Sequence, residues 1–197
     1  MNLPNKITIS RIVLSLLLMI GLLFPYELIG ITLPSKLVFG VVKVEIKYII
    51  GGIIFVIAAL TDFIDGNIAR KTKQVTDFGK VMDAIADKIL VNGILVILAG
   101  ADKINIAIPV VIITRDIFVD SIKMVAGSKG NTVGASIIGK IKTICMMIGI
   151  TLVFFYNLPF ELFNADVANA LLFVACVLSV ISGIQYYSAN KKYLLER

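Results

Sequence analysis

Residues 62–87 read DFIDGNIARKTKQVTDFGKVMDAIAD and lie between two strongly apolar stretches of the chain. The aspartates that matter most here are Asp62, Asp65, Asp83 and Asp87. On insertion scales, an aspartate at the centre of a bilayer costs roughly 2.5–3.5 kcal/mol. Four of them in one short stretch therefore require cations, or a chemical task that uses carboxylates.

Helical spacing places these aspartates on two faces that also carry small residues. The first face has positions i, i+3, i+4 and i+7, namely Asp62, Asp65, Gly66 and Ala69. The second face has positions i, i+4 and i+8, namely Gly79, Asp83 and Asp87. Residues 70–78 are polar enough for a turn at a membrane surface, so two antiparallel helices can point four carboxylates at each other. Hard oxygen ligands of this kind suit Mg²⁺ or Mn²⁺.

The composition of the chain indicates an all-α membrane protein. It has 197 residues, of which 58% are hydrophobic, and its mean hydropathy is +0.97. We predict a single membrane domain over residues 1–197. It would contain six transmembrane helices, at residues 10–32, 48–66, 80–100, 104–126, 139–157 and 166–187. The first apolar run is too long for the core of a signal peptide, so we interpret it as a retained anchor.

The distribution of basic residues predicts the orientation of these spans. The net charge is +6, and lysines and arginines concentrate near residues 70–80, near residues 123–142 and at the C-terminus. The positive-inside rule therefore places both termini and the aspartate-rich turn in the cytosol. Lys36, Lys43 and Lys47 argue against this orientation, but an even number of spans keeps their segment outside. The basic excess fits anionic lipids and phosphate substrates, and we expect no nucleic acid partner.

Two residue types limit the possible chemistry. The chain has no histidine, which excludes histidine-based triads, histidine–zinc sites and phosphohistidine intermediates. Its two cysteines, Cys145 and Cys176, lie in separate apolar spans. We expect both to be buried small apolar side chains and not a disulfide or a metal pair.

Eight fixed positions in the opening stretch, D-x2-D-G-x2-A-R-x8-G-x3-D-x3-D starting at Asp62, resemble the full signature of the CDP-alcohol phosphotransferase family. The resemblance implies transfer chemistry at the pyrophosphate of a CDP-alcohol, with two divalent ions, Mg²⁺ or Mn²⁺, in each active site. It implies that Asp62 and Asp83 bridge both ions. Asp65 would complete one metal site and Asp87 the other, and Asp87 would also be the catalytic general base. Spacing alone does not separate these roles.

The same resemblance implies contacts with CDP-diacylglycerol. These contacts would come from Asp62, Gly66, Ala69, Arg70 and Thr76. Arg70 would bind the nucleotide phosphates or the cytosine, and its alternative role is an anchor among lipid headgroups. Gly66 would let the base lie against the helix backbone. Thr76 stands at the family's small hydroxyl position, and an N-cap role for it is equally open.

A second group of residues bears on the acceptor alcohol. Arg115 lies midway along the fourth apolar span, where a charged side chain needs an anionic partner. Lys123 follows about two helical turns later, and Lys140 begins the fifth span. Together they could bind the phosphate of an acceptor such as glycerol 3-phosphate. In the alternative, Arg115 pairs with Asp116 or Asp120 and the lysines extend to the membrane surface.

The rest of the chain is similar to the bacterial phosphatidylglycerophosphate synthases of this family. The similarity rests on NLPNKITISRI at 2–12, TRDIF at 114–118, GKIKT at 139–143 and ISGIQYY at 181–187. Asp116, Lys123 and Ala84 depart from the pattern, which usually has glutamate, arginine and proline there, and none of them removes a metal ligand.

This similarity implies a specific reaction and setting. CDP-diacylglycerol and glycerol 3-phosphate would give phosphatidylglycerophosphate and CMP. The protein would be a homodimer in a bacterial cell membrane, surrounded by lipids, with its active site on the cytoplasmic side. A short N-terminal amphipathic segment would precede the first span, and Thr8 would border the acceptor pocket.

Three other readings of the sequence remain open at this stage. One keeps the fold and the chemistry but uses inositol phosphate or phosphatidylglycerol as the acceptor. Another is an ion-coupled transporter, because carboxylates inside a membrane also mark ion pathways. That reading predicts charges along several spans and an inverted repeat, and neither pattern is visible in the sequence. The last is a non-catalytic relative, which the complete signature argues against.

Overall fold

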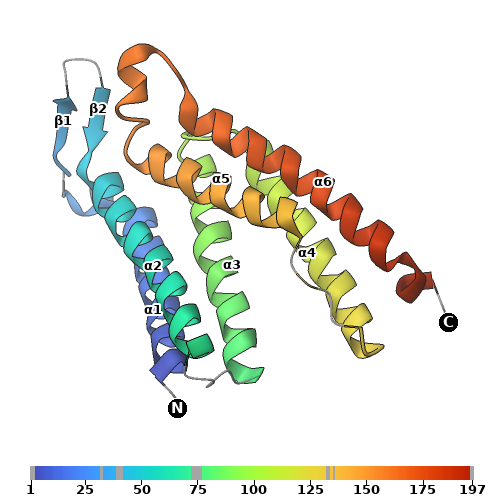
Figure 1. Cartoon of the computed structure of the whole chain (residues 1–197). Coiled ribbons are helices and arrows are strands. Elements are labelled where there is room, and N and C mark those ends of the chain that lie inside the picture. Colours follow the sequence, from blue (N-terminus) through green and yellow to red (C-terminus); the bar gives the residue numbers. More distant parts are fainter. Residues whose placement is uncertain are drawn as a thin grey trace. The chain divides into compact units, whose positions relative to one another are not determined.

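Six α-helices account for most of the described chain (Figure 1). The computed structural model describes residues 3–31, 33–38, 42–71, 77–131, 134 and 136–195, with the backbone alone for residues 3–5, 38, 62–71, 77, 78, 80 and 195. The helices are α1 (Leu3–Leu23), α2 (Ile46–Lys71), α3 (Asp77–Gly100), α4 (Ala107–Ser128), α5 (Ile137–Phe154) and α6 (Val167–Leu195). The shorter elements are the 3₁₀ helices η1 (Tyr26–Ile29) and η2 (Phe160–Phe163) and the strands β1 (Ser35–Val38) and β2 (Val42–Glu45).

The segment between α1 and α2 contains a β-hairpin that the sequence prediction missed. Helix α1 ends at Leu23 and not near residue 32, because Pro25 disfavours helical backbone in the residue before it. Strands β1 and β2 then pair antiparallel, with Ser35 opposite Glu45. The sequence of β2, VKVE, alternates apolar and polar residues as strands do, whereas SKLV in β1 does not. The chain is mostly helical, as predicted, and the hairpin is its exception.

Three of the described helices are long and apolar enough to cross a membrane. These segments are Lys6–Leu23, Ile137–Phe154 and Val167–Leu194, and a shorter apolar helix covers Ile46–Thr61. Charged residues interrupt the apolar sequence of the other helices, for example Asp87 in α3 and Arg115 in α4. The protein is therefore a helical membrane protein, and six spans remain a prediction.

Two smaller expectations differ from the structure. The N-terminal residues that we expected to form a separate amphipathic segment belong to α1, which begins at Leu3. Both cysteines are free, Cys145 in α5 and Cys176 in α6, and both are half-buried. They are therefore less buried than the sequence suggested.

The chain divides into two compact units, each with its own buried side chains. The first unit comprises residues 1–98 and 154–158, and its fully buried residues include Phe55, Ala58, Leu90 and Ile94. The second comprises residues 99–153 and 159–197, and its fully buried residues include Ile112, Ile150, Leu172 and Ala175.

Glycines allow helices to approach each other closely in the first unit. A Cβ atom on Gly51 of α2 would lie 3.1 Å from Leu22 and 3.5 Å from Leu18, both in α1. A Cβ atom on Gly93 of α3 would collide with the sulfur of Met19 in α1. Helix α1 therefore packs against both α2 and α3, and the contact with α3 matters for the site described below.

Glycines have the same role in the second unit, where α4 and α5 pack on α6. A Cβ atom on Gly183 of α6 would lie 3.2 Å from the Cγ atom of Arg115 in α4. A Cβ atom on Gly149 of α5 would lie 2.9 Å from the side chain of Leu172 in α6. The small residue at position 183 thus makes room for a large charged side chain between two helices.

Candidate active site

Helix α3 presents two of the four signature carboxylates on one side. Asp83 and Asp87 are half-buried and lie one helical turn apart. Gly79, one turn earlier, is buried. The predicted spacing of i, i+4 and i+8 on a helix is therefore confirmed for these positions.

Thr8 of α1 contacts this side of α3. Its side chain is almost fully buried, at 2% exposure. Its hydroxyl donates a hydrogen bond to Oδ1 of Asp83 at 2.6 Å, which is the length expected for a hydroxyl bound to an ionised carboxylate. We call Thr8, Asp83 and Asp87 the carboxylate face. The sequence placed Thr8 at the acceptor pocket, whereas this contact brings it to a signature aspartate.

Helix α1 buries two more polar side chains close to Thr8 in the sequence. Arg11 is 2% exposed and Ser15 is fully buried. The spacing of Thr8, Arg11 and Ser15 is i, i+3 and i+7, so they share one helix face. The resemblance places Arg11, like Thr8, in the region that borders the substrate pocket, but we predicted no role for it. Polar residues at this spacing inside an apolar run are a signal that could have predicted its burial.

Helix α2 carries the other half of the signature. Its backbone is helical through Lys71, so the predicted face with Asp62, Asp65, Gly66 and Ala69 exists as a backbone arrangement. The side chains of these residues and of Arg70 lie outside those that the structure describes. Thr76 and the rest of the turn at residues 72–76 also lie outside the described residues. The roles predicted for them stay predictions.

Arg115 makes three hydrogen bonds to described residues of the second unit. Its Nη1 donates to Oδ1 of Asp116 at 2.9 Å, its Nε to the carbonyl of Ser179 at 3.1 Å and its Nη2 to the hydroxyl of Ser182 at 2.8 Å. The guanidinium is thus fixed between α4 and α6. This geometry matches the alternative in which Arg115 pairs with Asp116, and the predicted acceptor role stays a prediction.

Lys142 of α5 also binds Asp116. Its ammonium donates to both carboxylate oxygens of Asp116, at 2.9 and 3.0 Å, and the residue is 4% exposed. We call Arg115, Asp116 and Lys142 the ion-pair cluster. The sequence prediction chose Lys140 from the same GKIKT motif, but Lys140 is exposed. Two residues apart on a helix means about 200° around its axis, so these two lysines point in different directions.

The periodicity of α5 could have distinguished the two lysines. Lys142, Met146 and Ile150 are all buried, at positions i, i+4 and i+8. Lys140 lies off this stripe. A charged residue in phase with the apolar face of a helix is the one that becomes buried.

Tyr186 of α6 brings Arg115 and Lys123 together. Its ring centroid lies 5.6 Å from the Cζ atom of Arg115 and 5.2 Å from the ammonium of Lys123. Its hydroxyl accepts a hydrogen bond from the backbone N–H of Ser136 at 2.8 Å and donates one to the carbonyl of Gly134 at 2.9 Å. These contacts tie the segment before α5 to α6. Two of the three predicted acceptor cations therefore share one aromatic ring, which attracts cations to its face.

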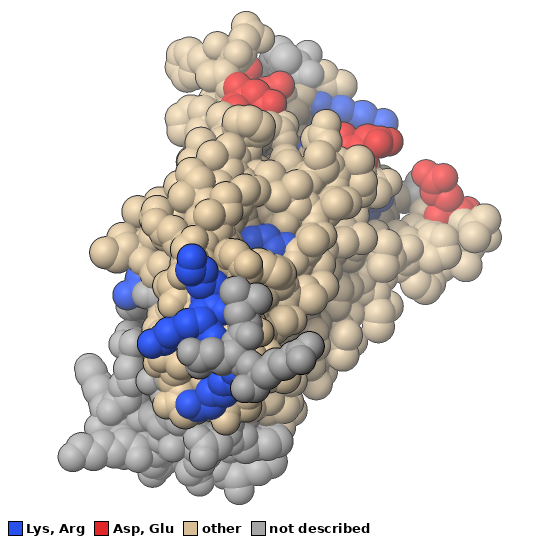
Figure 2. Space-filling view, turned by 90° about the vertical axis from the view of Figure 1, so that its right-hand side faces the viewer, with Lys and Arg blue, Asp and Glu red and all other residues tan. Residues whose placement is uncertain are grey.

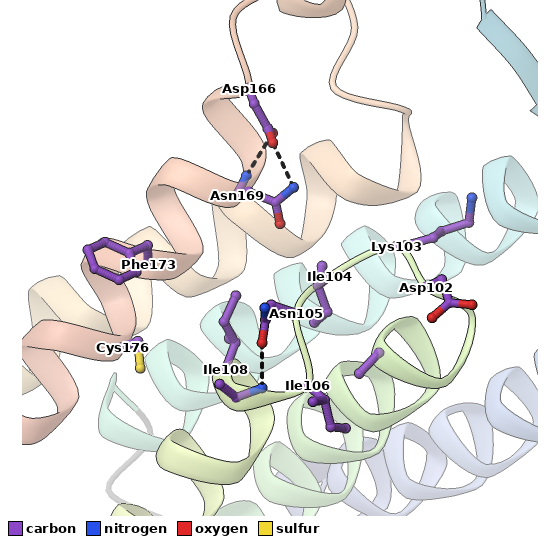
Figure 3. A pocket seen from close by; sticks show the side chains of 12 residues that line it. Asp102, Lys103, Ile104, Asn105, Ile106, Ile108, Asp166, Asn169, Phe173 and Cys176 are labelled. Carbon is purple, nitrogen blue, oxygen red and sulfur yellow. Dashed lines mark hydrogen bonds between the residues drawn. The ribbon is translucent and has the colours of Figure 1, made fainter.

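Figure 3 shows a different pocket, which lies within the second unit and encloses about 760 Å³. Polar groups here complete helix ends. Asp166 accepts hydrogen bonds from the backbone N–H and the side-chain amide of Asn169, at 3.1 and 2.8 Å. Asn105 accepts one from the backbone N–H of Ala107, at the start of α4. Among the described residues, none of the signature positions lines this pocket, so we interpret its polar groups as ones that bind the N-terminal ends of α4 and α6.

Figure 2 shows one face of the molecule with the described charged side chains coloured. Most of the lysines and arginines drawn in blue lie in the lower half of this view, and the acidic residues drawn in red lie in the upper half.

The sequence that forms this site matches a known protein family. The sequence pattern of the family described as CDP-alcohol phosphatidyltransferase matches residues 1–181, and the chain belongs to this family. A CDP-diacylglycerol–glycerol-3-phosphate 3-phosphatidyltransferase of Bacillus subtilis is 39% identical, and the similarity covers 96% of this chain and 95% of the relative. Relatives with the same name from Rickettsia felis and Haemophilus influenzae are 31% and 32% identical. They cover 98% and 99% of this chain, and 97% and 96% of their own lengths.

Proposed function

We propose that this chain transfers the phosphatidyl group of CDP-diacylglycerol to glycerol 3-phosphate, giving phosphatidylglycerophosphate and CMP. One observation carries the proposal. The complete family signature lies on α2 and α3, within a chain whose relatives with this activity in their name match it over nearly its whole length.

The described carboxylates fit a divalent metal ion. Asp83 and Asp87 offer hard oxygen donors one turn apart, and both are half-buried. Asp62 and Asp65 would supply the remaining donors for two ions, Mg²⁺ or Mn²⁺. When bound, these ions would offset the charge of the substrate pyrophosphate and stabilise the departing CMP.

In this proposal, Asp87 takes the proton of the attacking hydroxyl of glycerol 3-phosphate. The hydroxyl oxygen forms a bond to the phosphorus that carries the diacylglycerol, and the bond from that phosphorus to CMP breaks. Gly66, Ala69, Arg70 and Thr76, together with Asp62, would hold the CDP part of the substrate. The helical backbone of α2 supports a shared face for most of them.

Arg115 is the proposed centre of the acceptor site, and Lys123 and Lys140 are the other cations proposed for it. A guanidinium has five N–H groups, and the described partners of Arg115 use three of them. Two N–H groups of Arg115 are then left, among the described residues, for the phosphate of the acceptor. Asp116 and Ser182 would hold the guanidinium in place for this contact.

The proposal includes a membrane setting. Six spans would cross a bacterial cell membrane, with both termini and the active site on the cytoplasmic side. The three long apolar helices and the concentration of basic residues near residues 70–80, near residues 123–142 and at the C-terminus support this arrangement. Close helix contacts at glycines are compatible with the homodimer that we expect, because small residues permit helices to pack tightly in membranes.

An acceptor panel tests the proposal. The purified chain would receive CDP-diacylglycerol with glycerol 3-phosphate, inositol phosphate, phosphatidylglycerol or plain glycerol, and CMP release would be followed. We expect CMP release with glycerol 3-phosphate and much less with the others. Equal rates with plain glycerol would contradict a site for the acceptor phosphate, and a preference for another acceptor would reassign the substrate.

A further inference from the structure

We propose that Thr8 is a positioning residue for the metal-binding carboxylate of Asp83. Its hydroxyl holds Oδ1 of Asp83, so that Oδ2 is the oxygen presented to a divalent ion. This inference rests on the proposed function, because it assumes that the aspartates bind metal. It differs from the acceptor role that the sequence predicted for Thr8.

The direction of the Thr8 hydrogen bond is the first argument. Threonine in a helix commonly donates its hydroxyl back to a carbonyl of its own helix. Thr61, Thr143 and Thr151 do so here, at 2.7, 3.1 and 2.8 Å. Thr8 also donates across to α3, at 2.6 Å from Oδ1 of Asp83. A buried hydroxyl that reaches a signature carboxylate on another helix has a specific orientation.

A second contact fixes the register of α1 against α3. Met19 of α1 fills the space that Gly93 of α3 leaves open. It lies eleven residues after Thr8, and Gly93 lies ten residues after Asp83, so the two contacts are about three turns apart on both helices. A slip of one residue would turn Thr8 by about 100° away from Asp83. The packing of α1 against α3 therefore holds the hydroxyl of Thr8 against Oδ1 of Asp83.

The chemistry of a carboxylate makes this contact useful. An ionised carboxylate has two oxygens with about four acceptor positions, and a hydroxyl donor occupies only one. The hydrogen bond restricts the χ angles of Asp83 without adding a positive charge that would compete with a metal ion. Partners of this kind orient metal ligands, and losing one typically lowers metal affinity about 10–100-fold.

Binding of Mn²⁺ to the purified full-length chain tests the inference. The electron paramagnetic resonance signal of free Mn²⁺ would be followed as the ion is added to the wild type and to Thr8→Val, Thr8→Ser and Thr151→Val. Valine keeps the shape of threonine without the hydroxyl, and serine keeps the hydroxyl. Thr151→Val is the matched control, because it removes a hydroxyl whose bond among the described residues is to the carbonyl of Met147 in its own helix.

We expect Thr8→Val to weaken Mn²⁺ binding about 10–100-fold, while Thr8→Ser and Thr151→Val stay within about 3-fold of the wild type. The same variant should need more metal for half-maximal CMP release, with little change in the KM for glycerol 3-phosphate. If Thr8→Val does not fold, Thr8→Ala gives the same measurement with a smaller side chain.

Two outcomes would overturn the inference, and they are distinguishable. Unchanged Mn²⁺ affinity in Thr8→Val, with a raised KM for glycerol 3-phosphate, would return Thr8 to the acceptor pocket and leave the proposed function intact. A wild type that binds no Mn²⁺ and turns over in the presence of a chelator would remove the metal site itself, and with it the role of Thr8.

Discussion

The carboxylate face and the ion-pair cluster differ in how their charges are compensated. In the ion-pair cluster, Arg115 and Lys142 share the carboxylate of Asp116, so the positive charges have a partner within the chain. In the carboxylate face, the described partner of Asp83 is the neutral hydroxyl of Thr8. The ion-pair cluster therefore contains cations that offset the charge of its carboxylate, whereas the hydroxyl of Thr8 holds Asp83 without adding a charge.

This difference has a physical consequence for each region. A buried ion pair is sensitive to the loss of one partner, because the remaining charge is left in a medium of low dielectric constant. A carboxylate that is held by a hydroxyl can keep its charge without a fixed cation, provided that an ion or water reaches it. We therefore expect the loss of Asp116, the carboxylate that both cations share, to act first on stability, and mutations in the carboxylate face to act first on catalysis.

The largest effect should follow from Asp116→Asn. The change removes the charge that Lys142 faces at 2.9 and 3.0 Å, in a position where Lys142 is only 4% exposed. Breaking a buried pair typically costs about 3–5 kcal/mol. Thermal melting in detergent should shift down by at least ~6 °C. Asp102→Asn is the matched control at an exposed turn, and its melting should stay within about 2 °C of the wild type. Equal melting temperatures of the two variants would mean that the contact between Asp116 and Lys142 does not stabilise the fold.

The second effect should follow from Asp87→Asn. Asparagine keeps the shape and one oxygen ligand but cannot accept the proton of the attacking hydroxyl. Turnover should fall at least ~10²-fold, while CDP-diacylglycerol still binds and melting changes little. Turnover near that of the wild type would remove Asp87 from the role of general base. Lost nucleotide binding would instead assign it to metal binding alone.

A smaller effect should follow from Arg115→Ala, measured as the KM for glycerol 3-phosphate. Contacts to a charged phosphate are worth roughly 1.5–3 kcal/mol each, so this KM should rise at least ~10-fold, while the KM for CDP-diacylglycerol stays nearly unchanged. Lys123→Ala should act in the same direction but more weakly, because an ammonium cannot bind a phosphate in the bidentate manner of arginine. If Arg115→Ala lowers the melting temperature and leaves the KM alone, the arginine is a structural member of the ion-pair cluster.

The sequence was informative where a pattern repeats over several helical turns. The spacing of Gly79, Asp83 and Asp87 predicted their common helix face, because a period near 3.6 is hard to produce by chance over two turns. It was less informative about short elements. The hairpin of β1 and β2 was missed because each strand has only four residues, too few to establish a period of two.

Long-range contacts account for the rest of what the sequence did not predict. The sequence left two roles open for Arg115, and only packing against Ser179 and Ser182 of α6 shows how its guanidinium is held. The bond from Thr8 to Asp83 joins residues 75 positions apart, so no local pattern could reveal it. The burial of Lys142, by contrast, depends on a local pattern, and the phase of α5 would have predicted it, while the acceptor role of Lys140 stays a prediction.

Metal dependence of CMP release tests the central claim most directly, namely that the signature carboxylates require divalent cations from outside the chain. The measurement uses the purified wild type with CDP-diacylglycerol and glycerol 3-phosphate, first with an excess of chelator and then with Mg²⁺ or Mn²⁺ restored. We predict that the chelator abolishes CMP release and that either ion restores it, without a change in melting that would indicate unfolding. Full turnover in the chelator would contradict the account, because the negative charge of the carboxylate face would then be compensated without any added ion.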